Sequence, residues 1–576
     1  MTLLDRLAAI DPRAVVERLS RDPPQRILAR AARVAVQSGF GSMIGDPLAM
    51  GQIALQRGLG VRSLHALHAA GSPGRVAVID RHRQLDYAGL DAEIDAAANA
   101  LRADGARRGA PVGLLMENRC EYVALWMALT RLGIASAHLG TSATAAELAP
   151  ILERSGIERV LVSEATRDTA QQVATDHPQL GLRLIDVSQQ PAPGLASYHQ
   201  LIAQQRGRAT PTRDTEGDAA SVVFTSGTTG RPKGAVRDLQ SLGVMDLLRI
   251  LEVLPLRVGE RHLVVSPLYH SGAQAFTLLC SALGATLVLV DRFDAESVLD
   301  TLHHQRIEST FMVPTMLRRV LDLPAELHAR RPASTVRAIV SGAAPFPVGL
   351  RHRAIERFGA DAIFDFYGAT ELGWVTLATG HDMLEKPGTL GRPLGGQEVR
   401  VVDEDGRSVA DGEVGKIYTR SHQHMRGYLR DEAATSEIKD GGWVTVDDLG
   451  YLDPDGHLFL TGRARDMVIS GGVNVYPVEV ENVLSQHPQI RDVAVIGLPH
   501  ADWGEQLTAV VVAEEGFSAE AIDGWIRERL AKAKRPRRWE HVDVLPRNPT
   551  GKVLKRALRE RYADGSSDAG SAAGAS

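Results

Sequence analysis

Short apolar runs separated by amphipathic helical patterns dominate the first two thirds of the chain. Between about residues 75 and 340 these runs are PVGLLM at 111, RVLVS at 159, SVVFTS at 221, HLVVSP at 262 and TLVLV at 286. Runs of β-branched and aliphatic residues that alternate with helix-period segments are typical of α/β proteins with largely parallel sheets. The strand predicted in SVVFTS is expected to end at Phe224.

A different pattern begins further along the chain. Residues 396–430 alternate apolar with polar positions and contain turn dipeptides, which predicts a small antiparallel β unit. After Gly462 a compact unit follows, with one helix that has Pro477 in its first turn and a second helix near 519–531. The apolar positions that repeat at helical spacing in these two helices are Val480, Val483, Leu484, Ile522, Trp525, Ile526 and Leu530.

These patterns predict an α/β protein with two domains. A large N-terminal domain of parallel-type α/β sheets plus a small β unit is joined by a short connector to a small α+β C-terminal domain. We place an N-terminal helical extension at 1–70, the large domain at 71–462, the small mobile domain at 463–562 and a low-complexity, disordered tail at 563–576.

The N-terminal extension contains an amphipathic helical segment that starts at Arg26. Its predicted apolar face carries Ile27, Ala31, Val34 and Val36, and the opposite face carries Arg26, Arg30 and Arg33. We expect this helix to pack on the main body, and a peripheral membrane contact stays open as the alternative.

The longest mostly apolar stretch, Thr277 to Val290, is too short to cross a bilayer. The acidic residues and proline of MTLLDRLAAIDPR do not fit a secretion signal.

Composition excludes several classes of protein. With 576 residues and 44% hydrophobic side chains, the chain can bury large cores, and its net charge of −5 does not fit a nucleic-acid-binding protein. Two cysteines cannot build a disulfide framework, so we expect a cytoplasmic protein.

Only eight of the 65 basic residues are lysines, and the first is Lys233. Scarce lysines favour a specific role for each, because an ammonium is a compact donor on a flexible stem.

The segment SVVFTSGTTGRPKGAV at 221–236 is the strongest chemical signal. Glycines allow backbone N–H groups to point into one concavity, hydroxyls add donors, and Lys233 adds positive charge, which together suit phosphate oxygens. Gly234 follows Lys233 where the GxxxxGK[ST] nucleotide loop requires Ser or Thr. The predicted phosphate-binding residues are Thr225, Ser226, Gly227, Thr228, Thr229, Gly230 and Lys233.

Two further segments suit a nucleotide. In RAIVSGAAPF, Gly342, Ala343 and Ala344 let a flat ring approach the backbone closely. In FDFYGATELG, an aromatic beside a glycine can stack on a purine, and a carboxylate can bind Mg²⁺. The candidate residues there are Asp365, Phe366, Tyr367, Gly368, Thr370 and Glu371. Ligands bind at the carboxyl ends of α/β strands, so the three segments are expected to converge.

Near the C-terminus, PRNPTGKVLKRAL places Lys552 on a tight turn. An ammonium at the tip of a mobile domain can reach an oxygen on which negative charge develops, whereas Lys555 is expected to be a surface residue.

Together these motifs resemble, over roughly residues 75 to 560, the adenylate-forming superfamily of acyl-CoA synthetases, luciferases and peptide-synthetase adenylation domains. The resemblance implies that Tyr367 and Asp365 contact adenine, Thr370 a phosphate and Glu371 the metal. Asp448 and Arg463 would bind the ribose, although VDD replaces the usual TGD and leaves Asp447 as an alternative to Asp448. Lys552 would catalyse adenylation, and Arg465 would be the hinge about which the small domain rotates.

The resemblance also implies where the acid and CoA bind. His270 in PLYHSGAQ would lie where carboxylate meets phosphate or gate the acid pocket, and Gly472 would line a channel for pantetheine. The basic stretch 532–538 could contact CoA phosphates, although solvated surface is the more common role. Ser271, Gly272 and Ala273 offer no acid to pair with a substrate ammonium, so an unmodified carboxylic acid is favoured over an amino acid. Leu239 stands where the family commonly has His.

The implied activity is an ATP-dependent acid:CoA ligase with ATP, Mg²⁺ and CoA as cofactor or co-substrates. The catalytic candidates are Lys552, Lys233, Glu371 and His270. The N-terminal extension favours a medium- to long-chain fatty acid. An aryl or other carboxylic acid, and a carrier-protein thiol in place of CoA, are the alternatives. No nucleic-acid partner is expected, and the sequence leaves open whether the protein is a monomer or a homodimer.

Overall fold

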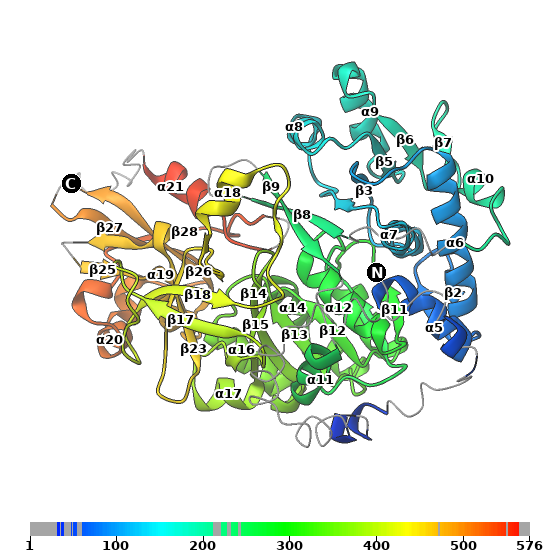
Figure 1. Cartoon of the computed structure of the whole chain (residues 1–576). Coiled ribbons are helices and arrows are strands. Elements are labelled where there is room, and N and C mark those ends of the chain that lie inside the picture. The colour runs from blue at the N-terminus through cyan, green and yellow to red at the C-terminus, as the bar shows by residue number, and fades with distance from the viewer. Residues whose placement is uncertain are drawn as a thin grey trace, which may run out of the picture.

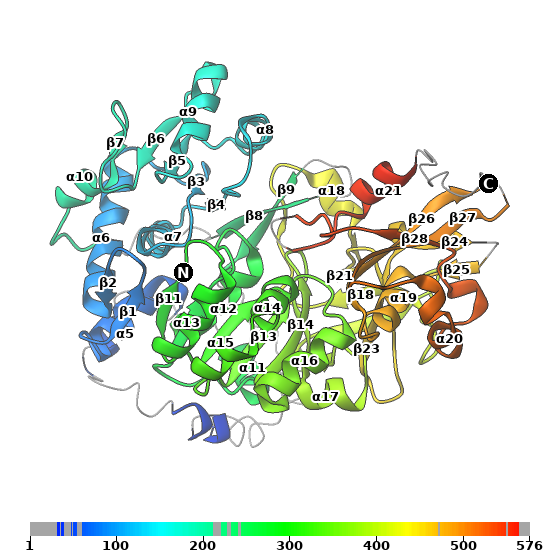
Figure 2. The same cartoon turned by 180° about the vertical axis from the view of Figure 1, so that it is seen from behind.

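The computed structural model describes residues 32–34, 36–39, 48, 50–53, 60–210, 220–226, 232–239, 244–470, 473–500, 502–548 and 551–563. Over these residues the strands form four sheets. The cyan strands β3 (Val112–Leu115), β5 (Arg159–Val162) and β6 (Arg183–Asp186) lie at one end of the molecule, and the orange and red unit lies at the other (Figure 1, and from behind in Figure 2). The protein is a mixed α/β structure, as predicted.

The largest sheet has a parallel centre and antiparallel edges. Its described strands, in spatial order, are β16 (Arg392–Pro393), β15 (Gly373–Thr379), β14 (Ile363–Ala369), β13 (Ala338–Gly342), β12 (Ser309–Met312), β10 (Arg261–Val264), β11 (Thr286–Leu289), β1 (Val76–Ile79) and β2 (Gln84–Asp86).

The second sheet is parallel except at one edge, where β8 and β9 form an antiparallel hairpin. Its described strands are β19 (Gly427–Tyr428), β9 (Pro232–Asp238), β8 (Ala220–Ser226), β4 (Ser136–His138), β3 (Val112–Leu115), β5 (Arg159–Val162), β6 (Arg183–Asp186) and β7 (Ala196–Ser197). The five predicted strands are therefore confirmed. β8 runs two residues past Phe224 because its ladder with β9 continues to Ser226 opposite Pro232.

One hydrophobic core joins these two sheets. Apolar side chains from α6 (Tyr87–Ala103), α7 (Cys120–Leu132) and α12 (Ser271–Ala282) pack between strands of both sheets, and Trp126 and Phe276 are among the most deeply buried. The outer helices are α5 (Leu64–Gly71), α8 (Ala145–Ser155), α9 (Arg167–Asp176), α10 (Tyr198–Ala203), α11 (Val244–Val253), α13 (Ala295–His304), α14 (Pro314–Leu321), α15 (Ala325–Arg330), α16 (Val348–Phe358) and α17 (Gly380–Glu385). Sharing a core holds the two sheets in a fixed relation, so their strand ends can build one site.

A third, antiparallel sheet confirms the predicted β unit and extends it to Arg463. It contains β17 (Glu398–Val402), β18 (Gly415–Arg420), β20 (Lys439–Asp440), β21 (Trp443–Val444), β22 (Asp448–Leu452) and β23 (Leu458–Arg463), with α18 (Glu432–Glu437) beside it. Arg465, the predicted hinge residue, lies in the short 3₁₀ helix η5 (Ala464–Asp466) that leaves this sheet.

The small C-terminal unit has its own sheet and core. Its elements are β24 (Val468–Ser470), β25 (Val473–Val475), α19 (Pro477–Leu484), β26 (Ile490–His500), β27 (Gly504–Ala513), α20 (Ala519–Arg529), β28 (Arg538–His541) and α21 (Lys555–Ala563). Both predicted helices are confirmed, with Val480, Leu484, Ile522 and Ile526 buried.

Two sequence predictions need correction. Val34 is buried in the main core, but Val36 is 84% exposed, because two residues along a helix correspond to about 200° of rotation and place the side chains on opposite faces. Lys555 is not a surface residue: its ammonium pairs with Glu481 at 2.7 Å and is 15% exposed.

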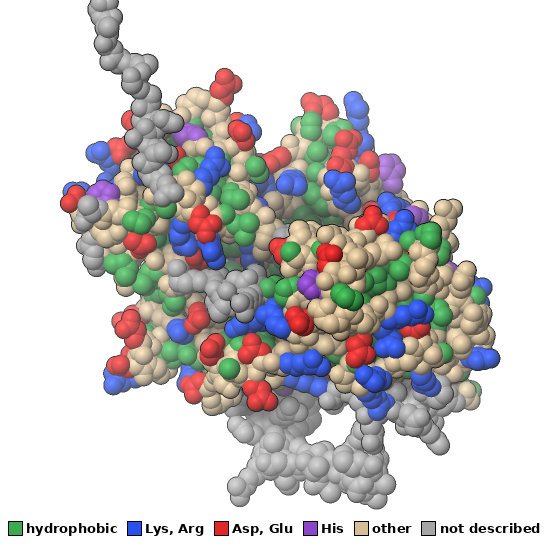
Figure 3. All heavy atoms as spheres, turned by 90° about the horizontal axis from the view of Figure 1, so that it is seen from above, with side chains coloured by type: hydrophobic (Ala, Val, Ile, Leu, Met, Phe, Trp, Pro, Cys, Tyr) green, Lys and Arg blue, Asp and Glu red, His purple; other side chains and the backbone are tan. Residues whose placement is uncertain are grey.

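Several predictions fall on residues that the structure does not describe. Arg26, Ile27, Arg30, Ala31 and the tail after Ala563 lie outside the described residues, so the amphipathic face and the disordered tail stay predictions. Within the described chain, no helix is both long and apolar enough to cross a membrane. Basic and acidic side chains are interspersed on the face seen from above (Figure 3).

Candidate active site

The predicted nucleotide segments converge at the ends of β8, β13 and β14. Gly342 at the end of β13 is in register with Phe366 on β14. The hydroxyl of Thr225, on β8, donates a hydrogen bond to Oε1 of Glu371 over 3.2 Å. Segments more than a hundred residues apart in the sequence therefore lie side by side at one edge of the two sheets, where ligands of α/β proteins bind.

The structure describes only part of the hairpin that is predicted to bind phosphate. Thr225 and Lys233 face each other across the β8–β9 ladder, and the Lys233 ammonium lies 5.2 Å from the ring centroid of Tyr428. Gly227, Thr228, Thr229 and Gly230, and the side chain of Ser226, lie outside the described residues. Their role in holding phosphates stays a prediction.

Glu371 is buried at 8% exposure and forms a small oxygen-rich cluster. Its Oε1 accepts hydrogen bonds from Thr225 and from the hydroxyl of Tyr428, the latter over 2.9 Å. Burial and the Glu371 charge raise the pKa of Tyr428, so this hydroxyl stays a donor. A carboxylate beside hydroxyl oxygens suits Mg²⁺, which prefers hard oxygen ligands, so the residues present fit the predicted metal.

The turn residues after β13 and β14 are small for steric reasons. A Cβ added at Gly342 would lie 2.6 Å from the backbone oxygen of Phe366, and one at Gly368 would lie 2.2 Å from that of Gly373. Ala343 is exposed and has a φ of 65°, and Ala344 is half-buried. Close backbone packing therefore requires glycine at 342 and 368, and the approach of a flat ring to this turn stays a prediction.

Asp365 has a structural partner that the sequence did not reveal. Its carboxylate forms a buried ion pair with Arg351, which also donates to the backbone oxygens of Phe346 and Thr389. Phe366, the next residue, points to the other face of β14 and lines a cavity. The ion pair occupies Oδ2 of Asp365, and the contacts of Asp365 and Tyr367 with adenine stay predictions.

Asp448 joins two sheets. Its Oδ2 accepts a hydrogen bond from the Tyr367 hydroxyl and its Oδ1 accepts one from Nε of Arg463, each over 2.9 Å. Asp448 is 5% exposed, whereas the side chain of Asp447 is 48% exposed and pairs with Lys416 on the outer surface. Of the two candidate ribose acids, Asp448 is therefore the one that lies beside Tyr367.

His270 and Lys552 approach each other from different domains. His270 precedes the first turn of α12, and its buried Nε2 has no hydrogen-bond partner among the described residues. Burial and the positive charge of Lys552 lower the pKa of His270 to about 3, so its ring is neutral. The hydroxyl of Thr315 donates to the backbone oxygen of Gly551 over 3.3 Å and fixes the turn that carries Lys552.

A cavity lies between the two sheets and reaches Ser271, the first residue of α12. Its walls include residues from α12, β9, β14 and β15. The lining consists of Ser221, Arg237, Asp238, Leu239, Ser271, Gly272, Gln274, Ala275, Leu278, Phe311, Ala343, Phe366, Gly368, Ala369, Gly373 and Trp374. Phe311, Phe366 and Trp374 form an apolar wall, and the acid in the lining, Asp238, pairs with Arg426, so the preference for an unmodified carboxylic acid stays a prediction.

Parts of the predicted CoA region have other partners. In the basic stretch 532–538, Lys534 pairs with Glu479, and the guanidinium of Arg537 lies over the ring of Trp503 and donates to Ser470. Gly472 lies outside the described residues. Contacts within the small domain thus occupy much of this basic stretch.

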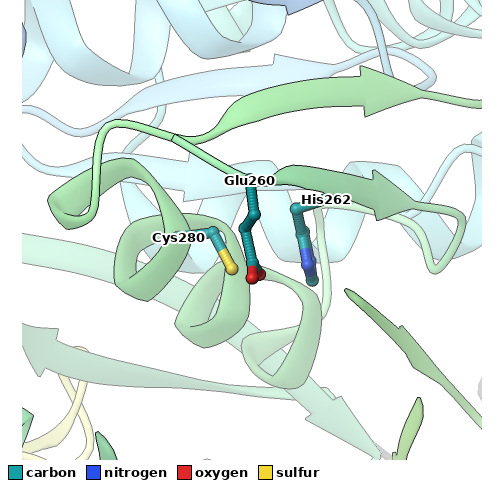
Figure 4. A group of neighbouring side chains, drawn as sticks. All are labelled: Glu260, His262 and Cys280. Atoms are coloured by element: carbon teal, nitrogen blue, oxygen red, sulfur yellow. The ribbon is translucent and has the colours of Figure 1, made fainter. Parts of the chain in front are cut away.

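Glu260 and His262, at the start of β10, and Cys280 on α12 form a titratable cluster (Figure 4). The Ser309 hydroxyl bonds both to Glu260 and to Nδ1 of His262, and Glu260 also accepts from Arg337 at 3.0 Å. Burial raises the pKa of Glu260 to about 7. Because these donors and acceptors already satisfy one another, the cluster is a buried polar network within the core.

Sequence reasoning missed Arg237, Thr315 and Tyr428. Arg237 lies two residues before Leu239, the noted departure from the family. No local pattern marks Thr315 or Tyr428, which reach the site from a helix and from an edge strand.

Two family models match the chain. One described as "AMP-binding enzyme" matches residues 66–429, and one described as "AMP-binding enzyme C-terminal domain" matches residues 479–552. The first match covers well over half of the chain.

Individual proteins are similar over nearly the same span. A 3-[(3aS,4S,7aS)-7a-methyl-1,5-dioxo-octahydro-1H-inden-4-yl]propanoyl:CoA ligase from Rhodococcus jostii is 33% identical over 506 residues, 84% of this chain and 95% of the relative. The long-chain-fatty-acid–CoA ligase FadD13 from Mycobacterium tuberculosis is 32% identical and covers 83% of this chain and 93% of its own. The crystal structure of ATP-bound MatB from Rhodopseudomonas palustris superposes with a TM-score of 0.78 at 30% identity, covering 88% and 99% of the two chains. The chain therefore belongs to the AMP-binding enzyme family, within the adenylate-forming superfamily of enzymes with a large N-terminal and a small C-terminal domain.

Proposed function

We propose that the protein is an ATP-dependent acid:CoA ligase that works in two half-reactions. In the first, an oxygen of the substrate carboxylate attacks the α-phosphorus of ATP, and the bond to pyrophosphate breaks. In the second, the CoA thiol loses its proton and attacks the acyl carbon of the acyl-adenylate, and AMP leaves. Both nucleophiles come from the substrates, so the protein needs to supply position and charge but no covalent nucleophile.

The observation that carries this proposal is the approach of the small domain to the strand ends. The Thr315–Gly551 hydrogen bond holds the turn that carries Lys552 against α14 of the large domain. The positive charge of Lys552 acts on His270, which places the ammonium near the edge where the nucleotide segments meet. In this position Lys552 stabilises the negative charge that develops as the carboxylate attacks the phosphate. The relative orientation of the two domains in this structure suits the first half-reaction.

The remaining site residues have supporting roles in the proposal. Lys233 and the hydroxyl-rich hairpin hold the phosphates. Asp448 accepts hydrogen bonds from the ribose hydroxyls, and Arg463 holds the Asp448 carboxylate in place. Glu371 is the residue that would hold Mg²⁺, which when bound neutralises phosphate charge. The neutral ring of His270 lies where the carboxylate would meet the phosphate and offers Nε2 as a hydrogen-bonding atom.

The cavity supports a carboxylic acid with an apolar body. Leu278, Phe311 and Trp374 suit either an alkyl chain or a ring, because both bury apolar surface there. The relatives include a ligase for a bicyclic propanoate and one named for long-chain fatty acids, so family membership does not decide between them. The N-terminal extension that favoured a medium- to long-chain fatty acid lies largely outside the described residues.

A panel of carboxylic acids tests the proposal. Pyrophosphate release is measured with ATP, Mg²⁺ and acids from acetate through aromatic acids to long chains, with and without CoA. We expect pyrophosphate with a subset of acids and acyl-CoA only when CoA is added. Release of the acyl group only to a holo-carrier protein would favour the carrier-loading alternative, and the absence of pyrophosphate with every acid would contradict the proposal.

A further inference from the structure

Arg237 places a guanidinium in the wall of the acid cavity. It lies on β9, four residues after Lys233, and lines the cavity together with apolar side chains such as Phe311 and Trp374. Burial lowers the pKa of Arg237 to about 10, so it still carries its positive charge at neutral pH. A charged group in a mostly apolar cavity is costly unless something compensates its charge.

The protein compensates this charge only in part. The Nη1 and Nη2 groups of Arg237 donate to the backbone oxygens of Thr370, over 2.8 Å, and of Gln423, over 3.2 Å. Glu371 acts on it from a longer distance, and among the described residues no carboxylate forms an ion pair with it. The neighbouring acid, Asp238, is paired with Arg426 at 2.7 Å.

The geometry leaves donors for a ligand. A guanidinium has five N–H groups, and two of those of Arg237 are used by the backbone. The others can bond to an oxygen inside the cavity, where the local dielectric strengthens a charge-assisted hydrogen bond. An acid that brings only methylene groups to this wall would leave those donors without a partner.

Building on the proposed acid:CoA ligase function, we propose that Arg237 selects acids whose apolar body carries a second oxygen acceptor, a carbonyl or a second carboxylate, in addition to the carboxylate that is activated. Sites built to hydrogen-bond a polar substrate group discriminate strongly against analogues that lack it, because the buried donors then stay unpaired. The two kinds of acceptor share this chemistry and differ in charge.

Matched acids test the proposal in the full-length enzyme. Each skeleton is offered as a monocarboxylate, with a distal ketone, and with a distal carboxylate: for the linear series octanoate, 7-oxooctanoate and octanedioate, with an aromatic and an alicyclic series beside it. The value of kcat/KM for pyrophosphate release is compared in the wild type, Arg237→Met, Arg237→Lys and Arg319→Met. Arg319 is exposed on α14 and serves as the control.

We expect the wild type and Arg319→Met to favour an oxygenated acid by about tenfold or more over its plain partner. Arg237→Met should lose this preference while the KM for ATP changes by less than about threefold, and Arg237→Lys should restore part of it. Preference for the diacid over the ketone identifies an anionic acceptor, and the reverse order identifies a neutral one.

Equal turnover of plain and oxygenated acids by the wild type would overturn this proposal and leave the ligase function intact. A loss in Arg237→Met that falls equally on all acids and raises the KM for ATP would also overturn it, since that pattern shows that Arg237 only supports the Thr370–Glu371 turn. If pyrophosphate is not released from ATP with any of the acids, the proposed ligase function itself is contradicted.

Discussion

The hydroxyl of Thr315 on α14 donates a hydrogen bond to the backbone oxygen of Gly551 across the boundary between the two domains. A Cβ added at Gly551 would lie 2.9 Å from that hydroxyl oxygen, and Gly551 has a φ of 78°, so both the space and the backbone favour glycine here. The contact fixes the turn that carries the next residue, Lys552, whose positive charge acts on His270.

In the proposed function, Lys552 acts only in the first half-reaction. We expect Lys552→Ala to lower pyrophosphate release by about 10²-fold or more, because an ammonium facing developing charge is removed. Thioester formation from supplied acyl-adenylate should be largely spared. The exposed Lys439 of β20 provides a control, Lys439→Ala, that should leave both rates unchanged. Equal loss in both half-reactions would contradict a mechanism with two domain orientations.

The ion pair between Arg318 and Asp492 also spans the domains, at 2.6 Å with both side chains largely buried. Arg318→Met removes it, and we expect pyrophosphate release to fall several-fold while acyl transfer from supplied acyl-adenylate to CoA is maintained or accelerated. The neighbouring exposed residue gives a matched control in Arg319→Met. A variant that slows acyl transfer as much as adenylation would show that the pair does not favour one orientation.

Asp447 and Asp448 form a natural pair for mutagenesis. Asp448→Asn removes the charge that Arg463 and Tyr367 share, and we expect the KM for ATP to rise about 10- to 100-fold, the range for hydrogen bonds to charged groups. Asp447→Asn should change it less than about threefold, because Asp447 faces outward toward Lys416. Steady-state titrations of ATP at saturating acid separate the two; a larger effect at Asp447 would reverse the assignment of the ribose acid.

Glu371 should control the requirement for magnesium. Glu371→Gln keeps the shape but removes the anionic oxygen, so we expect the Mg²⁺ concentration for half-maximal pyrophosphate release to rise about tenfold or more. Tyr428→Phe removes only one hydrogen bond to Glu371 and should have a smaller effect. Titration of Mg²⁺ at constant free ATP is the measurement. An unchanged Mg²⁺ requirement in Glu371→Gln would argue for another ligand.

Stability should fall as the pH falls, in part because of His138. Burial lowers the pKa of His138 to about 3, and its ring nitrogens bond to Tyr122 and Ser136. Its stabilising contribution is fully present above the unfolded pKa of 6.5 and is lost as the pH falls toward 3, because the unfolded chain binds the proton first. By pH 5.5 the stability that has been lost amounts to about 1.4 kcal/mol.

Denaturant unfolding at pH 7.5 and 5.5 tests this assignment. We expect the difference in unfolding free energy between the two pH values to be smaller in His138→Gln than in the wild type by about 1 kcal/mol. His352→Gln, at an exposed position on α16, should behave like the wild type. The same pH dependence in wild type and His138→Gln would exclude His138 as its source.

The sequence by itself determined the fold class and named the candidate site residues. Alternation of apolar runs with helical patterns specified the parallel strands, because each run must bury both faces between helices. The phosphate hairpin and the YGATE segment were recognisable because a turn that binds phosphate or stacks a base needs particular small, hydroxyl and charged residues in consecutive positions. Val36 shows the limit of such reading, since a residue two positions from a buried one was assigned to the wrong face.

Only the tertiary structure decided which side chains act together. Asp448 could be distinguished from Asp447 once its contact with Tyr367, 81 residues away in the sequence, was known. Arg351 beneath Asp365, Tyr428 beside Glu371 and Arg237 in the acid cavity come from elements that no local motif links to their partners. The physical reason is that burial, hydrogen bonding and charge compensation depend on distance in space, and the sequence encodes that distance only through the packing of the whole chain.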